Sequence, residues 1–444
     1  MYLVRTLWLL ACGALLAGCA IKPPPRLSCN FRSFDVRIDD SATRRAGGLA
    51  ALDPYTEAVR QSLEAGAARA AILPGRPPGF LSLSGGSLNG AYGAGYLDEW
   101  RLRSPSQRLP VFPSVTGIST GAILATFAFT NRTEAAVRGY SIAREDQLLK
   151  TFVKPKQGKL GIGAYVKMLR RGALGDLAPL RTRLDDAIDD SVLRDVAAGA
   201  ADGRSLFVGV VDVDTGEAVA MDLTDMAQRY AAAQNGRPDH WKRCYIEAIV
   251  ASSSAPMAAA PVYIDNRMYI DGGARFGMFN EGQIRAATLV RGSARASRRQ
   301  EPDNFLLING EQRIAQRCGK RNAAACTKDS QTGGDVEPTD WRLTDLALRS
   351  ESILANQVYR FSEDKVAGNG AIARTTKIER DVDEHPFTIA DKPLGPGQHT
   401  CGEWKKIDVD FDDPVQFKPR YMHCLINYGR KRASEEGWWR VASQ

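Results

Sequence analysis

The fold of this chain is decided at the stretch Val115-Thr116-Gly117-Ile118-Ser119-Thr120-Gly121-Ala122. The residues just before Gly117 predict a short strand, and the apolar run Ala122–Phe129 predicts a helix. A serine at such a sharp strand-to-helix turn exposes its hydroxyl at the end of a sheet, and small residues at Gly117 and Gly121 relieve crowding there. The pattern alone is weak, because a chain with 41 glycines contains such spacings by chance. Its position between a strand and a helix makes Ser119 a candidate nucleophile.

A second strand-to-helix turn lies upstream. Residues 80–84 predict a strand, and Gly85-Gly86-Ser87-Leu88-Asn89-Gly90 leads from it into a helix through Tyr96 and Trp100. Glycines at such a turn let main-chain N–H groups converge on an anion, either a bound phosphate or the oxyanion of an acyl-transfer reaction. The spacing of these glycines matches neither the dinucleotide-binding pattern nor a P-loop. The phosphate interpretation is therefore the less favoured of the two.

Strands and helices alternate along the rest of the chain. Further strands are expected at 206–211, 218–223 and 305–308, and further helices at 53–71, 180–188 and 341–366. This alternation predicts a three-layer α/β/α fold with a mostly parallel central sheet. The proline-rich and cysteine-containing remainder predicts a separate C-terminal extension.

A nucleophilic serine needs a base, because its hydroxyl is a weak nucleophile at neutral pH. None of the four histidines stands in an obvious active-site turn. Asp271 is better placed, since it follows a predicted strand, and Gly272 and Gly273 allow another loop to approach it closely. An Asp-Gly pair is also common in simple turns.

The amino-acid composition limits the classes of protein to which this chain can belong. The chain has 444 residues, of which 44% are hydrophobic and 25% are charged, as in ordinary globular proteins. Disorder, collagen-like repeats, a small disulfide scaffold and a multi-pass membrane protein are excluded as the main architecture. The formal net charge of +8 is compatible with anionic lipid or nucleic acid. Because the basic residues are scattered, we expect no nucleic-acid partner.

The amino-terminal residues predict export. Arg5 precedes an apolar run that is too short to span a bilayer, and Leu16-Ala17-Gly18-Cys19 follows it. This ending resembles the bacterial lipobox, in which the signal (residues 1–18) is removed and Cys19 is lipidated. Ala20 is not the aspartate that retains lipoproteins at the inner membrane. The expected location is therefore the bacterial cell envelope, with a lipid anchor in the outer membrane.

Six cysteines remain after Cys12 and Cys19, and an even set in an exported protein suggests disulfides. Proximity favours Cys318–Cys326 and Cys401–Cys424, although connectivity cannot be deduced from sequence. The histidines have no zinc spacing, so we expect neither a metal nor another cofactor.

Four motifs in this order resemble the patatin-like phospholipase family. The segment Leu83–Gly95 is similar to its glycine-rich oxyanion segment, residues 115–122 to its nucleophile elbow, residues 251–262 to the segment that precedes its aspartate, and residues 269–273 to its Asp-Gly-Gly/Ala motif. The resemblance covers about residues 78–310, and extends at most to 365. It departs from the family at Ser87, where a third glycine is usual, and at Asn89, where a basic residue is frequent.

The resemblance implies a lipid acyl hydrolase with a Ser–Asp dyad. Asp271 would accept the proton of Ser119, which attacks an ester carbonyl, and the N–H groups of Gly85, Gly86 and Ser87 would hold the oxyanion. The substrate would be a phospholipid or another lipid ester, and protein partners are not specified. The predicted divisions are a signal peptide (1–18), a tether and N-terminal segment (19–77), a patatin-like acyl hydrolase domain (78–365) and a C-terminal extension (366–444).

Two other functions stay open. A carboxylesterase with a Ser-His-Asp triad would use one of the histidines as its base. A catalytically silent, membrane-tethered binding or scaffold lipoprotein would use the fold without the reaction, and the departures at Ser87 and Asn89 motivate this alternative.

Overall fold

The computed structural model describes residues 27–36, 53–68, 79–105, 107–152, 172–233, 238–293, 303–310, 343–367, 372–412, 414–435 and 440–441. The expected signal peptide, the lipidation site Cys19 and the expected Cys318–Cys326 pair lie outside these residues. No helix among the described residues is both long enough and apolar enough to cross a membrane.

A central sheet organises the molecule. In the described part of the chain it has ten strands, which are β1 (Ser33–Asp35), β2 (Phe80–Leu83), β3 (Ser114–Ile118), β6 (Ser205–Asp212), β7 (Ala218–Asp222), β9 (Val262–Ile264), β10 (Arg267–Asp271), β11 (Asp303–Ile308), β12 (Ile372–Lys377) and β15 (Arg440–Val441). The order is β1-β7-β6-β3-β2-β11-β12-β15, and β10 also pairs with β6 and carries β9.

The middle of this sheet is parallel. The strands β6, β3, β2, β11 and β12 pair in parallel, whereas β1, β7, β10 and β15 join antiparallel. Every residue of β3 and β6 is buried, as expected for strands covered on both faces. The predicted mostly parallel sheet flanked by helices is confirmed.

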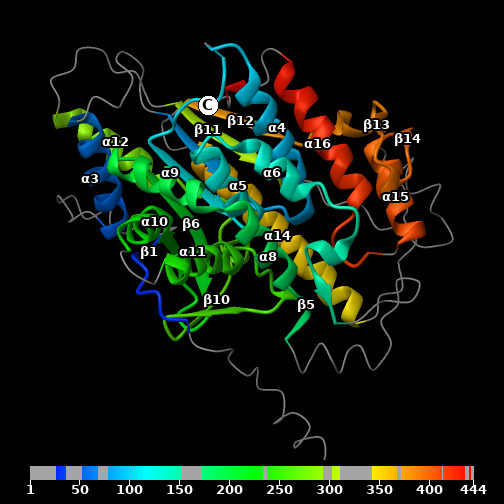
Figure 1. Cartoon of the computed structure of the whole chain (residues 1–444), viewed down its shortest axis with the longest axis horizontal. Coiled ribbons are helices and arrows are strands. Elements are labelled where there is room, and N and C mark those ends of the chain that lie inside the picture. The colour runs from blue at the N-terminus through cyan, green and yellow to red at the C-terminus, as the bar shows by residue number, and fades with distance from the viewer. Residues whose placement is uncertain are drawn as a thin grey trace, which may run out of the picture.

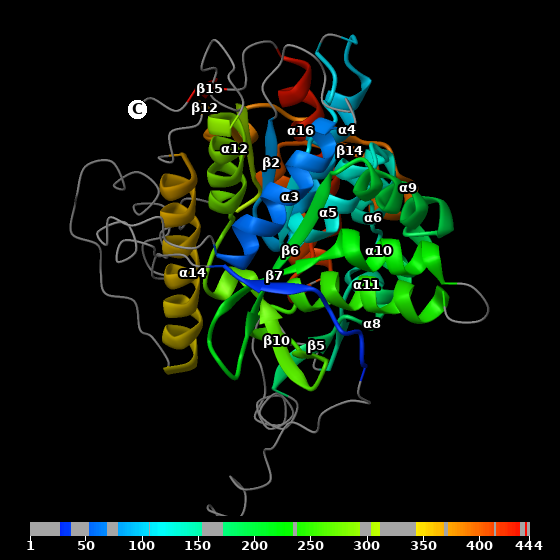
Figure 2. The ribbon, with the colours of Figure 1, turned by 90° about the vertical axis from the view of Figure 1, so that its left-hand side faces the viewer.

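Helices cover both faces, as Figures 1 and 2 show. Alternate residues of β6 face opposite layers, because side chains of a strand alternate between its two sides: Val208 packs in one apolar cluster and Phe207 in another. One layer contains α3 (Pro54–Ala68), α12 (Glu281–Ser293) and α14 (Leu343–Ala367). The other contains α4 (Gly90–Leu102), α5 (Thr120–Phe129), α6 (Thr133–Tyr140), α8 (Ala178–Ala187), α9 (Asp190–Ala201), α10 (Leu223–Ala232), α11 (Pro238–Ser252) and α16 (Pro419–Ser434).

Smaller elements complete the described structure. Three short strands form a separate sheet, β4 (Lys150–Thr151), β5 (Ala173–Asp176) and β8 (Met257–Ala259). Short 3-10 helices are η1 (Ser87–Asn89), η2 (Glu145–Gln147), η3 (Gly272–Ala274), η4 (Arg380–Asp383) and η5 (Lys392–Leu394). Two of these, η1 and η3, follow the strands β2 and β10. They lie in the glycine-rich loop and in the Asp-Gly-Gly motif, respectively.

The C-terminal residues pack on the sheet and its helices. Strand β12 extends the sheet by pairing in parallel with β11, and α16 lies along α4, where the rings of Tyr92 and Tyr428 are 5.7 Å apart. Arg430 and Asp98 form an ion pair between the same helices at 3.1 Å. The expected extension is therefore not separate in space, because it completes one edge and one layer of the fold. Its boundary at residue 366 stays a prediction.

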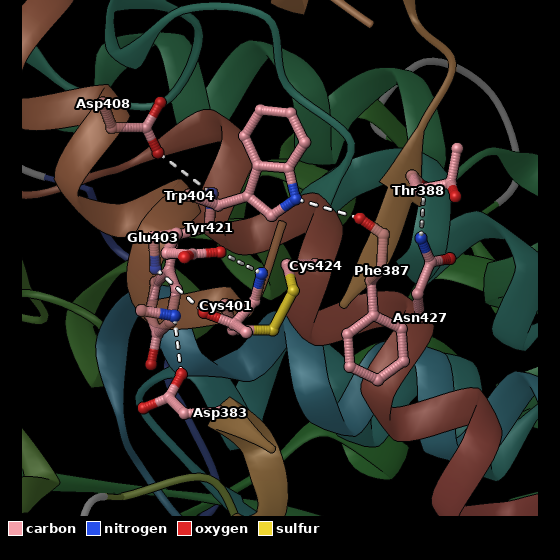
Figure 3. The surroundings of a disulfide bond; sticks show 12 residues. Asp383, Phe387, Thr388, Cys401, Glu403, Trp404, Asp408, Tyr421, Cys424 and Asn427 are labelled. Carbon is pink, nitrogen blue, oxygen red and sulfur yellow. Dashed lines mark hydrogen bonds between the residues drawn. A yellow bond between two sulfur atoms is a disulfide. The ribbon is translucent and has the colours of Figure 1, made fainter. Parts of the chain in front are cut away.

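A disulfide holds the outer part of this extension together (Figure 3). Cys401, at the start of α15 (Cys401–Phe411), is bonded to Cys424 of α16, as predicted from their proximity. Trp404 donates a hydrogen bond of 3.1 Å to the carbonyl of Phe387 in the hairpin formed by β13 (Phe387–Ile389) and β14 (Gly397–His399). A second disulfide joins Cys29 to Cys244 in α11, a pairing that the sequence did not suggest.

Candidate active site

Ser119 stands between β3 and α5 in a strained conformation. Its φ is 55° and its ψ is −123°, a region that side-chain-bearing residues rarely adopt. A Cβ on Gly117 would lie 2.3 Å from the carbonyl oxygen of Gly121, and one on Gly121 would lie 2.2 Å from that of Leu83. The turn therefore requires glycine at both positions. The sequence pattern predicted this requirement from crowding at the turn. Ser119 is 6% exposed.

Two serines at the end of α11 hold this turn. The Ser119 N–H donates to the Ser252 hydroxyl at 2.9 Å, and that hydroxyl donates to the carbonyl of Gly209 in β6 at 2.6 Å. Ser253 donates to the Ser119 carbonyl at 3.2 Å. Sequence reasoning assigned no such role to these serines, because nothing local shows that the end of α11 reaches the end of β3. The only signal was a run of hydroxyl groups after an apolar helix.

The sheet brings Asp271 to the same edge. In the sheet register, Ile118 of β3 pairs with Gly209 of β6, and the next residue of β6, Val210, pairs with Asp271. Ile118 and Asp271 therefore lie in adjacent rows along β6, and Ser119 follows Ile118 directly. Asp271 is 4% exposed. The carboxyl ends of parallel strands are where ligands bind in open α/β sheets.

The glycines after Asp271 allow its loop to approach the elbow. A Cβ on Gly272 would lie 2.6 Å from the Gly209 carbonyl oxygen and 3.0 Å from Cγ2 of Ile118. The Gly273 N–H donates to Oδ1 of Asp271 at 2.7 Å. This hydrogen bond fixes one oxygen of the Asp271 carboxylate. The loop itself packs against Ile118, the residue that precedes Ser119.

The glycine-rich loop after β2 closes the site from another side. A Cβ on Gly85 would lie 3.2 Å from Cβ of Ser119. The Gly85 N–H donates to the carbonyl of Gly277 at 3.4 Å. Gly86 and Ser87 stand at the N-cap and the first position of η1, where N–H groups have no acceptor inside the helix. Of the three predicted oxyanion donors, Gly86 and Ser87 are thus better suited than Gly85.

Ser87, at the position where the resemblance leads us to expect a glycine, adopts the left-handed conformation. Its φ is 53°, which costs a side-chain-bearing residue conformational energy. Its hydroxyl accepts a hydrogen bond of 2.8 Å from Gln416, which lies between α15 and α16. Asn309 fixes the start of the same loop, because its side-chain amide donates to the Ser84 carbonyl at 2.9 Å and its N–H to the Ser84 hydroxyl at 2.9 Å.

A cavity of about 470 Å³ opens beside these residues. Ser87, Ser119 and Asp271 line it together. Much of its wall is apolar and comes from α5, α6, α8 and the turns beside them: Ile123, Phe127, Ala135, Ala136, Tyr140, Leu148, Leu177, Leu180, Leu184 and Ala187. Polar side chains in the wall are those of Asn89, Arg183, Arg349, Asn356, Tyr359 and Gln416. The size and the apolar wall suit an acyl chain.

The four histidines, all of which are described, lie elsewhere. None of His240, His385, His399 and His423 lines the cavity. Among the described residues there is also no group of three or more histidine, cysteine, aspartate or glutamate side chains that could hold a metal ion. The carboxylate of Asp271 is the acidic group that shares the cavity wall with Ser119.

A strained serine at the carboxyl end of a central strand, beside a carboxylate and an apolar cavity, makes this region the candidate site for nucleophilic catalysis. The family model for the Patatin-like phospholipases matches residues 81–279, which include Ser119 and Asp271. The matched segment is therefore a patatin-like phospholipase domain within the chain. No curated protein matches the chain.

Proposed function

We propose that the protein hydrolyses carboxylic ester bonds of lipids through a dyad of Ser119 and Asp271. The observation that carries this proposal is their placement in the wall of one largely apolar cavity, with Ser119 in a strained turn at the start of α5. Strain of this kind persists only where the surrounding structure enforces it, and it exposes the serine hydroxyl to a substrate.

The reaction begins with attack of Ser119 Oγ on the ester carbonyl carbon, while the hydroxyl proton passes to the Asp271 carboxylate. The oxyanion rests on the N–H groups of Gly86 and Ser87, aided by the positive end of α5. When the tetrahedral intermediate collapses, the C–O bond to the alcohol breaks and Asp271 returns the proton to the leaving oxygen. Water then attacks the acyl-enzyme by the same route, with Asp271 as base, and releases the fatty acid.

Burial makes an aspartate usable as the base. In water its reference pKa of about 3.9 makes it a weak base. At 4% exposure, Asp271 is shielded from water, and within the proposed dyad its proton transfer with Ser119 would not require extensive solvent reorganisation. We propose a phospholipid or a related lipid ester as substrate, since the cavity combines an apolar wall with several polar side chains.

The test is ester hydrolysis by variants of the full chain. Ser119→Ala and Asp271→Asn should each lower the hydrolysis of a short-chain nitrophenyl ester by roughly 10³-fold or more while the thermal unfolding midpoint stays near that of the wild type. Ser141→Ala is a matched control, because that hydroxyl bonds only the Val137 carbonyl within the described residues and does not line the cavity. Wild-type hydrolysis by Ser119→Ala would refute the proposal.

Covalent labelling separates this function from a silent scaffold. A fluorophosphonate probe should modify Ser119, as peptide mass spectrometry can show, and prior Asp271→Asn substitution should slow the labelling. A folded protein that neither labels nor hydrolyses mixed phospholipids would favour the binding or scaffold alternative. Lipid mass spectrometry of the products then gives the ester position that is cleaved.

We also propose that a lipid on Cys19 tethers the protein to the cell envelope, at the outer membrane. The support is the sequence Leu16-Ala17-Gly18-Cys19 and the proline-rich residues that follow it. Anchoring would bring the cavity close to its substrate without any membrane-spanning helix. Cys19→Ala should abolish incorporation of labelled palmitate and move the protein out of the membrane fraction. Unchanged fractionation would refute the anchor and leave the hydrolase proposal untouched.

A further inference from the structure

Helix α14 inserts one aromatic side chain among the loops of the site. A Cβ on Gly85 would lie 2.1 Å from the hydroxyl oxygen of Tyr359, and one on Gly273 would lie 2.8 Å from it. A Cβ on Gly277 would lie 2.5 Å from a ring carbon of Tyr359. Three glycines from two different loops thus form a slot that the Tyr359 ring fills. A larger residue in place of any of these glycines would displace the ring.

The slot places the phenol oxygen near both of the proposed reactive groups. The Cβ position of Gly85, next to this oxygen, is also 3.2 Å from Cβ of Ser119. The Cβ position of Gly273, likewise next to it, is 3.0 Å from Oδ1 of Asp271. Tyr359, Ser119 and Asp271 all line the same cavity. The hydroxyl therefore lies where the glycine-rich loop and the Asp-Gly-Gly loop meet.

Contacts on the next turns of α14 hold Tyr359 in this place. Ser362 accepts a hydrogen bond of 2.8 Å from the Gly277 N–H and donates one of 2.8 Å to the Val358 carbonyl. Lys365 forms an ion pair with Glu281 of α12 at 3.3 Å. Val366 packs in the apolar cluster of β11 and β12. These contacts fix both the rotation of the helix and its depth against the sheet.

We propose that Tyr359 is a positioning residue whose hydroxyl donates a hydrogen bond to the Asp271 carboxylate. This inference rests on the proposed function. Burial disfavours a charged carboxylate, and each hydrogen bond donated to the charged form offsets that effect. The Gly273 N–H supplies one donor, to Oδ1. The phenol supplies a second, and since its reference pKa is about 10 it stays protonated throughout the working range of the dyad.

Tyr359→Phe tests this role, because phenylalanine still fills the slot. Without the phenol donor, protonation of Asp271 becomes easier, so its pKa rises and the base form appears only at higher pH. The acidic limb of the kcat/KM profile should move upward by about one pH unit, so kcat/KM at a fixed pH on that limb should fall roughly 10-fold. A merely structural contact would not move the limb.

Tyr245→Phe is the matched control. Its buried hydroxyl is hydrogen-bonded to Thr126 at 2.9 Å and it does not line the cavity, so its loss should leave the pH profile unchanged. In an Asp271→Asn background, Tyr359→Phe should cause less than a twofold further change in fluorophosphonate labelling, since the tyrosine acts through the aspartate.

The outcomes separate this inference from the proposed function. An unmoved acidic limb in Tyr359→Phe, with or without a lower kcat, overturns the role of Tyr359 if Ser119→Ala is inactive. Activity that survives in Ser119→Ala overturns the dyad itself, whatever Tyr359→Phe does. A thermal midpoint of Tyr359→Phe within a few degrees of the wild type establishes that the kinetic comparison concerns folded protein.

Discussion

Gln416 donates a hydrogen bond of 2.8 Å to the hydroxyl of Ser87, a residue of the loop proposed to hold the oxyanion. The carboxylate of Glu145 fixes the segment that carries Gln416, by accepting the N–H groups of Val415, Gln416 and Phe417 at 2.9, 2.5 and 2.8 Å. Gln416 and Phe417 also line the cavity. The C-terminal residues therefore build part of the site and contact the one loop residue that departs from the family's glycine.

Gln416→Leu should weaken catalysis more than folding. It removes a hydrogen bond of about 1 kcal/mol to a residue with positive φ, so the loop that carries the Gly86 and Ser87 N–H groups becomes less well defined. We expect kcat to fall about 3- to 10-fold, as measured with a nitrophenyl ester.

Gln398→Leu, at an exposed position of β14 in the same extension, should leave kcat unchanged. If both variants have wild-type kcat, the Gln416–Ser87 contact does not support the oxyanion loop.

Ser252→Ala should affect both stability and activity. It leaves the Ser119 N–H and the Gly209 carbonyl without their buried partner, which costs roughly 1–3 kcal/mol of unfolding free energy. Because the elbow is then held less firmly, kcat should fall about 10-fold or more. Urea denaturation and ester hydrolysis measure the two effects.

Ser205→Ala provides the comparison for that experiment. Its buried hydroxyl donates to Ser114 at 2.9 Å, where β6 and β3 begin, and it does not line the cavity. It should lower stability with little change in kcat. A normal kcat in Ser252→Ala would show that the strained turn maintains itself without this hydrogen bond.

The two described disulfides should differ in their contribution to stability. Cys29–Cys244 spans 215 residues, whereas Cys401–Cys424 spans 23. In the chain-entropy description the longer loop restrains the unfolded chain more, by about 2 kcal/mol. The Cys29→Ala/Cys244→Ala variant should therefore lose more unfolding free energy than Cys401→Ala/Cys424→Ala. An equal or larger loss in the second variant would contradict this ranking.

His423 of α16 should make stability fall in mild acid. Burial lowers the pKa of His423 below its ordinary value of 6.5, although Asp391 and Asp408 act in the opposite direction. The unfolded chain then binds a proton at a higher pH than the folded protein does. Stability contributed by neutral His423 is present above about pH 6.5 and is lost as the pH falls from there toward the folded-state pKa.

Denaturation at several pH values between 7 and 5 checks this dependence. His423→Gln should have a shallower decrease in unfolding free energy over that range than the wild type. Parallel curves for wild type and His423→Gln would mean that other groups account for the acid sensitivity.

Much of the fold could be predicted from the sequence because its signals are local. The helix expected at 53–71 is α3 and begins at Pro54, and the strand expected at 206–211 lies within β6. The strand-turn-helix units around Gly85 and Ser119 could be predicted for the same reason, since steric crowding within a turn depends on adjacent residues alone.

The order of the strands was not available from these local patterns. That β12 would join β11, or that Cys29 would meet Cys244, depends on chain segments that are far apart in sequence. Local propensity says whether a segment forms a strand, but burial against distant partners decides which edge it joins.

The sequence by itself determined the elbow at Ser119, the glycine-rich loop and the Asp-Gly-Gly turn, because each is a short run whose backbone needs small residues. Only the tertiary structure decided which distant side chains surround them. Ser252 and Gln416 reach the site across 133 and 329 positions of the chain, and Tyr359 reaches it from a helix with no motif of its own. Such contacts depend on strand register and helix packing, which the sum of many weak interactions determines.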